Sequence, residues 1–400
     1  MSKPTNYGSN NNNEAYSVIN AAYAQATGKE AVDTLDLQYI VDAATDWSTV
    51  EKAKFGAELS QQWVKTVYTD TTYSVKEDDV FFEDAATFGG ITRVISMEMP
   101  EVIENRSWTA MTSGVSTIGE NTVYLPVANE QLFVGTVSWE VPVTFTGTQL
   151  NAAFDSVAGL NEFNAFVQLA ANNSIRKHQQ GLSRANRNNF IAEKINAQNA
   201  PGNTRVHVVN LVAEWCAYNG VASMTAAQFL RNSDALRYST LVFTEYRRYL
   251  QDISALFTTK AQTNGMFVSP DRMVFQMLAK YRGLLENVVY SSTWHEDFVK
   301  ATGFRDVSAW QGLTKDTTAL SFDALSSIDV TTSAGNEISA SGIVGLMVDK
   351  WAIMHTTVQN RVGVQDDDIK DVHLRAFQFT DRYINNMILP GVVFVVQDVA

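Results

Sequence analysis

The feature that most constrains the fold is a proline-free stretch of helical spacing from about residue 152 to residue 200. Apolar residues recur along it at steps near three, four and seven, which is the pattern of an amphipathic helix. They are Phe163, Phe166, Val167, Ala170, Ile175, Leu182, Ala185, Ile191 and Ile195. A continuous helix of about forty residues would be ~60 Å long, which is long for a globular domain. Gly181 leaves open whether the stretch is one helix or two, and Pro201-Gly202 closes its end.

A second stretch, from Gly135 to Thr146, has an apolar period of two. Val137, Trp139, Val141, Val143 and Phe145 fall on one side of it, and polar residues with Pro142 fall on the other. This alternation predicts a strand with one apolar face, within a long antiparallel hairpin that spans about residues 94–145. Pro142 is expected at an edge or bend, because it lacks an N–H group.

The sequence leaves open what covers this apolar face. It packs either on the chain's own core or on a neighbouring subunit. In the second case the five apolar residues are the candidates for intersubunit contact. Trp139 and Phe145 would be the anchors, since interface energy concentrates in large aromatic side chains.

Overall composition limits the function. The chain has 400 residues, which is enough for two or three domains, and a net charge of −13, which argues against a reader of nucleic-acid sequence. Cys216 is the single cysteine, so no intramolecular disulfide forms and a reducing compartment is expected. The N-terminus has no apolar core of a signal peptide, and the longest apolar run, near Val392–Val396, is too short to cross a bilayer. We therefore expect a soluble protein.

The remaining segments mix helices and strands, which makes the chain an α+β protein. Residues 1–14 are polar and expected to be disordered. Residues 15–73 predict two or three helices, which could pack on the chain itself or reach a neighbour. Residues 341–357 and 388–396 predict buried strands near the end of the chain.

Motifs of enzymes are missing from the sequence: it has no phosphate-binding loop, no dinucleotide fingerprint and no nucleophile elbow. His295-Glu296-Asp297 and the run Asp366–Asp368 are the residues that a metal-dependent enzyme could use. Three adjacent side chains rarely converge on one ion, and an acidic run is usually solvated, so we expect no catalytic, cofactor or metal site.

Positive charge is concentrated within the long helical stretch. Arg176, Lys177, Arg184, Arg187 and Lys194 lie there, in a chain that is otherwise acidic. They form either an ordinary solvated face or a surface toward packaged nucleic acid or a neighbour's acidic patch.

The order of the parts resembles the major capsid proteins of tailed bacteriophages with the Hong Kong 97-type fold. In both, a polar arm precedes an extended hairpin, a long helix, a mixed α/β region and closing strands. Residues 372–379 and 386–396 look like the way those chains end. Length and the asparagine-rich start are also similar to capsid proteins of short-tailed phages of the schitovirus kind. The resemblance covers almost the whole chain and is architectural, because no single motif marks this family.

The resemblance implies a domain plan and an assembly. The arm would take residues 1–70 and the E-loop 91–148. The P-domain, with the long helix as its spine, would take 71–90, 149–203 and 371–400, and the A-domain 204–370. In such shells the E-loop lies across a neighbouring subunit. Some members crosslink an E-loop lysine, but no lysine lies between Lys76 and Lys177 here, so an uncrosslinked shell is expected.

The function implied by the resemblance is structural. The subunit would assemble with itself into hexamers and pentamers of an icosahedral head around double-stranded DNA, which it contacts only non-specifically. It would be assembled in the host cytoplasm and reside in the virion, with portal and scaffolding or decoration proteins as partners and no membrane. An encapsulin-type nanocompartment shell, which carries protein cargo instead of DNA, and a soluble metal-dependent enzyme are the alternatives.

Overall fold

A computed structural model describes most of the chain after residue 127 and little before it. The described residues are 23–24, 81, 92–97, 128–146, 157–258, 265–290, 304–311, 320–331, 335, 337–367 and 372–400. They belong to two compact units. Unit 1 takes its described residues from 1–89, 136–183 and 355–382, and unit 2 takes them from 90–135, 184–354 and 383–400.

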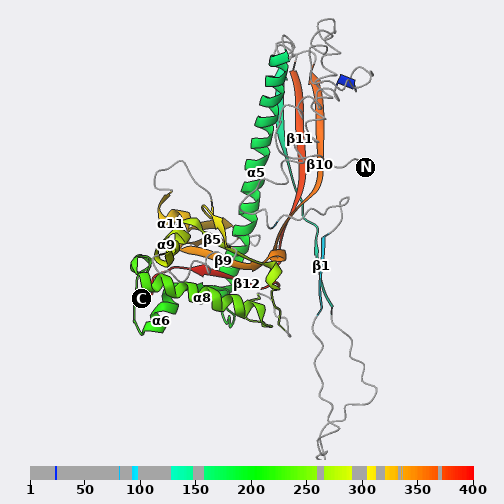
Figure 1. The fold of residues 1–400 in the computed structure, drawn as a ribbon. Coiled ribbons are helices and arrows are strands. Elements are labelled where there is room, and N and C mark those ends of the chain that lie inside the picture. The colour runs from blue at the N-terminus through cyan, green and yellow to red at the C-terminus, as the bar shows by residue number, and fades with distance from the viewer. Residues whose placement is uncertain are drawn as a thin grey trace, which may run out of the picture. The chain divides into compact units, whose positions relative to one another are not determined.

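The described chain contains both helices and strands (Figure 1). The strands are β1 (Thr92–Met97), β2 (Ala128–Phe133), β3 (Val137–Thr146), β4 (Val208–Asn210), β5 (Met273–Leu278), β6 (Phe304–Val307), β7 (Ile328–Thr331), β8 (Glu337–Ala340), β9 (Ile343–Asp349), β10 (Ile353–Asp367), β11 (Val372–Asn385) and β12 (Gly391–Val395). The helices are α5 (Val157–Asn199), α6 (Leu211–Asn219), α7 (Ala226–Arg231), α8 (Ser233–Gln251), α9 (Ala279–Tyr290) and α11 (Phe322–Leu325).

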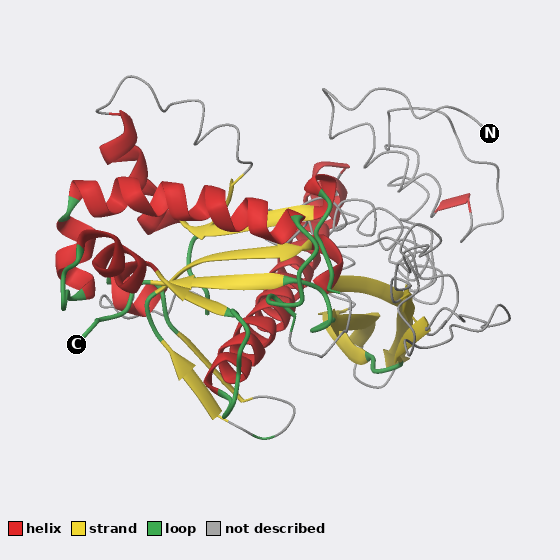
Figure 2. Cartoon of the chain, turned by 90° about the horizontal axis from the view of Figure 1, so that it is seen from below, coloured by secondary structure: helices red, strands yellow, loops and turns green. Residues whose placement is uncertain are grey.

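Unit 2 is built on a mixed five-stranded sheet with the order β4-β12-β9-β5-β6. The central strands β9 and β12 are buried at every residue, because both faces of the sheet are covered. Phe243 of α8 contacts Phe275 and Phe394 on one face, with ring centroids 5.1 and 4.9 Å apart. Phe190 of α5 packs beside Gly391 on the other face. Figure 2 shows helices on both sides of these strands. The buried strand expected over 388–396 is confirmed.

The backbone of Gly342, which precedes β9, packs closely against the backbone of Val396. Its φ of +76° lies in the left-handed region, where a side chain is strained. A Cβ at this position would also collide with the carbonyl oxygen of Val396. Both facts require glycine here.

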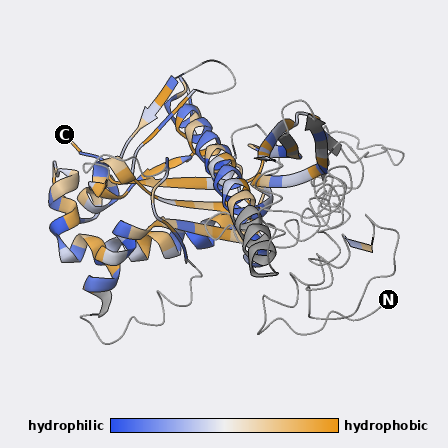
Figure 3. Ribbon diagram, turned by 90° about the horizontal axis from the view of Figure 1, so that it is seen from above, coloured by the Kyte–Doolittle hydropathy of each residue, from blue (hydrophilic) through white to orange (hydrophobic). Residues whose placement is uncertain are grey.

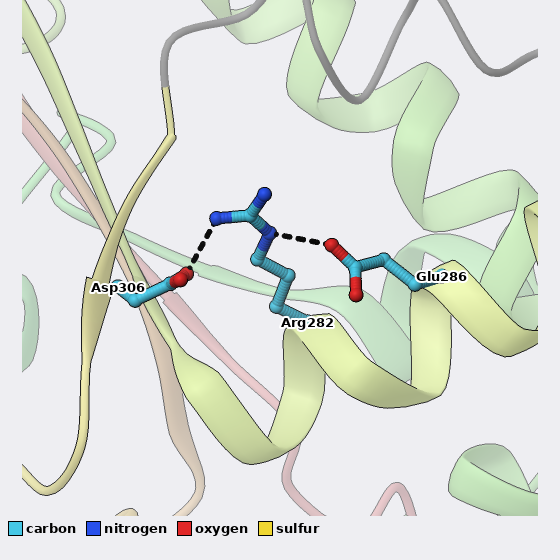
Figure 4. Close-up of polar contacts among 3 residues, drawn as sticks. All are labelled: Arg282, Glu286 and Asp306. Atoms are coloured by element: carbon cyan, nitrogen blue, oxygen red, sulfur yellow. Dashed lines mark hydrogen bonds and ion pairs between the residues drawn. The ribbon is translucent and has the colours of Figure 1, made fainter.

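An ion-pair group joins α9 to the edge strand β6 (Figure 4). The Arg282 Nε atom donates to Glu286 at 2.9 Å, and its Nη1 atom donates to Asp306 at 2.7 Å. All three side chains are partly exposed, so the group stabilises the edge by less than about 1 kcal/mol per pair. Its role is to orient β6 on the sheet.

Unit 1 contains a three-stranded sheet with the order β10-β11-β3. β3 pairs antiparallel with β11, from Val137↔Asp381 to Thr146↔Val372. The alternating burial expected for residues 137–146 is confirmed, and so is the edge position of Pro142. The partner of β3 is a strand from the end of the chain. Residues 98–127 of the predicted hairpin lie outside the described residues.

The helix α5 has 43 residues and is about 65 Å long at ~1.5 Å per residue. It continues without interruption through Gly181, so the predicted stretch is one helix. In Figure 3 hydrophilic and hydrophobic colours mix along the coloured part of this helix. Its described buried positions recur every three or four residues, from Ala171 through Ile175, Gln179, Ser183 and Arg187 to Lys194. The buried face is therefore partly polar.

Candidate assembly surface

Two of the basic residues in α5 are buried, which corrects their expected position facing DNA. Arg187 and Lys194 are fully buried inside unit 2. The Arg187 guanidinium donates to the Trp310 carbonyl oxygen at 3.2 Å and lies 5.0 Å from the centre of the Trp310 ring. The Lys194 Nζ atom donates to the Phe257 carbonyl oxygen at 2.9 Å. Their long stems fill the core while backbone carbonyls and a ring satisfy their charged ends.

Two other basic groups, Arg205 and His207, lie near Lys194. Burial lowers the pKa of Lys194 to about 7, and the charge of Arg205 acts in the same direction. Burial likewise lowers the pKa of His207 to about 4, with help from Lys194 and Arg205. A buried ammonium without a carboxylate is costly, so the amine gives up its proton far more readily than an exposed lysine.

The other basic candidates lie nearer the surface. Lys177 is exposed, while Arg176 and Arg184 are half-buried, and Arg184 donates to the Ser308 hydroxyl at 3.4 Å. Of these three, Lys177 is the one whose side chain is exposed.

The apolar face of β3 packs on its own chain, which is one of the two arrangements that the sequence left open. Phe145 is buried, and Trp139, Val141 and Val143 pack on a core formed by Ala171, Ile175, Phe377 and Phe379. Trp139 stacks on Phe379 at 4.4 Å. The sequence left this intramolecular arrangement open, and the helix α5 with strand β11 supplies the cover.

A buried polar network sits beside this core. Trp139 Nε1 donates to Asp381 at 2.7 Å, and Asp381 lies 3.6 Å from His355 Nε2. The other ring nitrogen of His355 is 3.3 Å from the Ser183 hydroxyl. The Ser183 hydroxyl faces Nδ1 of His355 and the Asp381 carboxylate faces Nε2, which is the reverse of the arrangement in Ser-His-Asp hydrolases. All three side chains are buried. The network joins β3, β10, β11 and α5, and its role is structural.

Three large apolar residues are exposed on the segment that runs from the end of β2 to the start of β3. Leu132 is 56% exposed, Val134 is 61% exposed and Val137 is 45% exposed. Val137 is the one predicted contact residue whose side chain is exposed to solvent. Leu132 and Val134 were missed, because the alternation in the sequence is clear only from Gly135 onward. We name Leu132 and Val134, which both belong to unit 2, the ribbon patch.

The ribbon after which this patch is named is the two-stranded sheet of β1 and β2. β1 pairs antiparallel with β2 from Thr92↔Phe133 to Met97↔Ala128. Two strands alone are marginally stable in water, and exposed apolar side chains favour association. The ribbon patch therefore exposes apolar side chains on a two-stranded sheet.

The described residues contain little that resembles a ligand-binding or metal-binding site. A shallow depression of about 430 Å³ lies on the polar face of the unit 1 sheet. The residues that line it are Ser138, Trp139, Glu140, Gln359, Arg361, Gln378, Phe379 and Thr380. Its polar groups bond to one another, as in Arg361 to Gln378 at 2.6 Å, whereas ligand pockets are mostly apolar.

The metal candidates lie mostly beyond what the structure describes. His295, Glu296, Asp297 and Asp368 are outside the described residues. Within those residues, no three His, Cys, Asp or Glu side chains are grouped to hold a metal ion. The described part of the chain also contains no helix long and apolar enough to cross a membrane. Cys216 is buried.

Comparison with known proteins gives matches of structure only. No family model matches the chain, and no curated protein matches it. The capsid structure of Staphylococcus phage Andhra aligns at 8% identity and TM-score 0.47, covering 79% of this chain and 83% of that one. The capsid structure of the cyanophage P-SCSP1u aligns at 9% identity and TM-score 0.42, covering 79% and 85%. The mature capsid of bacteriophage PhiM1 aligns at 11% identity and TM-score 0.40, covering 79% and 84%.

These matches come from phage capsids, the class of assembly that the resemblance in the sequence names. At such identities and TM-scores, the function has to be argued from the chain's own residues.

Proposed function

We propose that this chain is a structural protein of a phage head, the major capsid subunit that assembles with itself into hexamers and pentamers around double-stranded DNA. The observation that carries the proposal is the ribbon patch, two large apolar side chains exposed on and beside a ribbon that is marginal alone. The order of the elements supports it: ribbon, 43-residue helix, helix-covered mixed sheet and returning strands.

The mechanism of such a protein is geometric. In this proposal the ribbon β1–β2 is the part of the E-loop that reaches a neighbour, and α5 is the spine from which it extends. Residues 1–70 form the arm, and 204–370 form the A-domain around which rings close. Heterologous contacts close these rings, and burial of the ribbon patch contributes about 25 cal/mol per Å² of apolar surface removed from water.

Contact with DNA is non-specific in this proposal. Lys177 is the leading candidate, with Arg176 and Arg184 beside it on α5, because Arg187 and Lys194 are buried. The shell forms in the host cytoplasm, resides in the virion and takes portal and scaffolding or decoration proteins as partners.

The test is a double substitution in the ribbon patch, Leu132→Asp with Val134→Asp. Both side chains are exposed, so the subunit should keep its far-UV circular dichroism and its unfolding midpoint while shells and rings disappear from negative-stain images. Leu320→Asp is the matched control, since Leu320 is 63% exposed elsewhere on the chain and the variant should assemble normally.

Two results would overturn the proposal. A wild-type protein that stays monomeric under all assembly conditions is not a shell subunit. Normal shells from the double variant would remove the ribbon patch from the assembly. Shells that enclose protein cargo in place of DNA would assign the chain to the encapsulin-type alternative.

A further inference from the structure

Two tyrosines lie ring to ring where the helices α6 and α8 of unit 2 meet. Tyr218 is near the end of α6, and Tyr238 is near the start of α8. Their ring centroids are 4.6 Å apart and the ring planes differ by 29°, which is a stacked arrangement. The pair therefore joins two helices through side chains that are already in contact.

The two tyrosines differ in how firmly they are held. Tyr218 is 67% exposed, and exposed side chains change rotamer on the picosecond to nanosecond timescale. Tyr238 is half-buried, and its ring centroid lies 5.5 Å from that of Trp215. The Tyr218 ring can therefore slide from stacking toward edge-to-edge contact while Tyr238 stays in place.

Carboxylates accompany the more buried ring. Burial raises the pKa of Tyr238, and the charges of Glu214 and Glu245 raise it further. The phenol therefore keeps its proton at neutral pH. The same two carboxylates are bases in its neighbourhood, which can receive the proton when the ring loses an electron.

We infer that Tyr218 and Tyr238 are a site of oxidative crosslinking, at which a one-electron oxidant from outside the protein converts the stacked pair into dityrosine. Each phenol loses one electron and one proton and becomes a phenoxyl radical. The two radicals form a C–C bond between ring carbons ortho to the oxygens, and the ring hydrogens at these carbons then move to the oxygens to restore two phenols. The oxidant takes two electrons in total, and two protons pass to water.

Proximity is the physical reason for this choice of partners. Groups held in contact react as if at very high concentration, so coupling within the stacked pair should exceed coupling between molecules. Tyr246 and Tyr249 on α8 provide a comparison. Their centroids are 5.6 Å apart with 78° between the planes, and the Tyr246 hydroxyl donates to Glu214 at 3.3 Å. Their greater distance and perpendicular rings favour coupling less.

The crosslink supplies a covalent staple that this chain cannot obtain from a disulfide, since Cys216 is its single cysteine. It joins α6 to α8 and closes a loop that contains α7. Closing a loop lowers the entropy of the unfolded chain, so the crosslinked protein should unfold at a higher urea concentration. The bond forms within one copy, and the inference therefore does not depend on the proposed shell.

The experiment oxidises the full chain with visible light, a ruthenium(II) tris-bipyridyl complex and persulfate, which takes up the electrons. Trypsin places the two tyrosines in different peptides, because Arg231 and Arg237 lie between them. Mass spectrometry should find these peptides joined, with two hydrogen atoms fewer than their sum. The yield should be at least about tenfold above that of any other tyrosine pair.

Two variants control for the chemistry. Tyr218→Phe keeps an aromatic ring in the stack but forms no phenoxyl radical, so the joined peptides should disappear. Tyr249→Phe removes an exposed tyrosine from the same helix α8 and should leave the yield unchanged. Circular dichroism before oxidation should be the same in both variants and the wild type.

An equimolar mixture of ordinary and heavy-isotope-labelled chains separates bonds within one copy from bonds between copies. The joined peptides should be entirely light or entirely heavy. Mixed-isotope products, a product that persists in Tyr218→Phe, or preferred coupling at another tyrosine pair would overturn the inference. An unchanged urea midpoint after complete crosslinking would overturn the role of the bond as a staple.

Discussion

At the scale of single residues, the buried cations of α5 are the feature with the clearest energetic consequence. Arg187 keeps its charge, because the guanidinium meets a carbonyl oxygen and the face of Trp310. Among the described residues, the Lys194 ammonium donates to the Phe257 carbonyl oxygen and lies 5.4 Å from the centre of the Phe190 ring, and Arg205 and His207 are its basic neighbours. The Lys194 amine is the group that releases its proton.

The lowered pKa of Lys194 predicts that the stability of the protein depends on pH. The pKa of Lys194 is about 7 in the folded chain and 10.5 in its ordinary state, so the unfolded chain binds more protons between these values. The free energy of unfolding contributed by this group should therefore rise with pH from about 7 to 10.5, by up to ~1.4 kcal/mol per pH unit, and level off below 7.

Urea unfolding at a series of pH values measures this slope. Lys194→Met removes the titrating group and should flatten the profile, while Lys177→Met, which changes an exposed lysine of the same helix, should preserve it. An unchanged slope in the Lys194→Met protein would show that another group causes it.

Trp139 gives a second prediction at this scale. Trp139→Ala removes the stack on Phe379 and leaves the buried Asp381 carboxylate without its indole donor. The expected loss is about 2–4 kcal/mol of unfolding free energy, as for other large-to-small changes in packed sites. Trp139→Phe keeps an aromatic ring and should recover part of the loss, as denaturant titration would measure. A Trp139→Ala protein of normal stability that fails to assemble would instead restore Trp139 as an intersubunit anchor.

At the scale of elements, the long helix depends on tertiary packing. Its buried face includes Gln179, Ser183 and Arg187, so its amphipathic signal is weak and its residues belong to two different units of the chain. Gly181 is exposed and has open space where a Cβ would lie. Glycine there lowers helix propensity without providing a turn or a close approach.

Glycine substitutions test this interpretation. Gly181→Ala should raise the unfolding free energy by about 0.5–1 kcal/mol, because alanine restricts the unfolded chain and fits the helix. Gly283→Ala in α9 is a parallel case with the same open space, and Gly342→Ala should destabilise the protein because of its positive φ and the Val396 carbonyl. Chemical denaturation of the three variants measures these changes in unfolding free energy. If Gly181→Ala were destabilising, that glycine would have a role beyond the helix.

At the scale of the whole molecule, charge is distributed unevenly. The chain carries a net charge of −13, and its exposed and half-buried basic residues on α5 are few. If the chain forms the proposed shell, its net negative charge should repel DNA, and attraction should come only from local basic residues. Screening by salt then acts mainly on a small number of contacts.

The corresponding prediction concerns assembled protein. Neutralising Arg176 and Lys177 to glutamine should weaken binding of double-stranded DNA and reduce the salt dependence of its affinity by about one unit of slope for each phosphate that no longer meets a cation. Fluorescence anisotropy with labelled DNA over a salt series measures both. Arg187→Gln should act through stability instead, because Arg187 is buried. DNA affinity that is unaffected by the first pair would exclude this face of α5.

The local pattern of the chain determined its elements. Spacing near three and four predicted α5 within a few residues of its ends, and a period of two predicted β3 and the edge position of Pro142, because periodicity depends only on the geometry of a helix or strand. Only the tertiary structure decided what covers each face. Strand β11, more than two hundred residues away, pairs with β3, and Phe379 covers Trp139. Buried carbonyls accept from Arg187 and Lys194, which charge alone would place in solvent. Such partners are set by contacts between distant segments, and no local spacing encodes them.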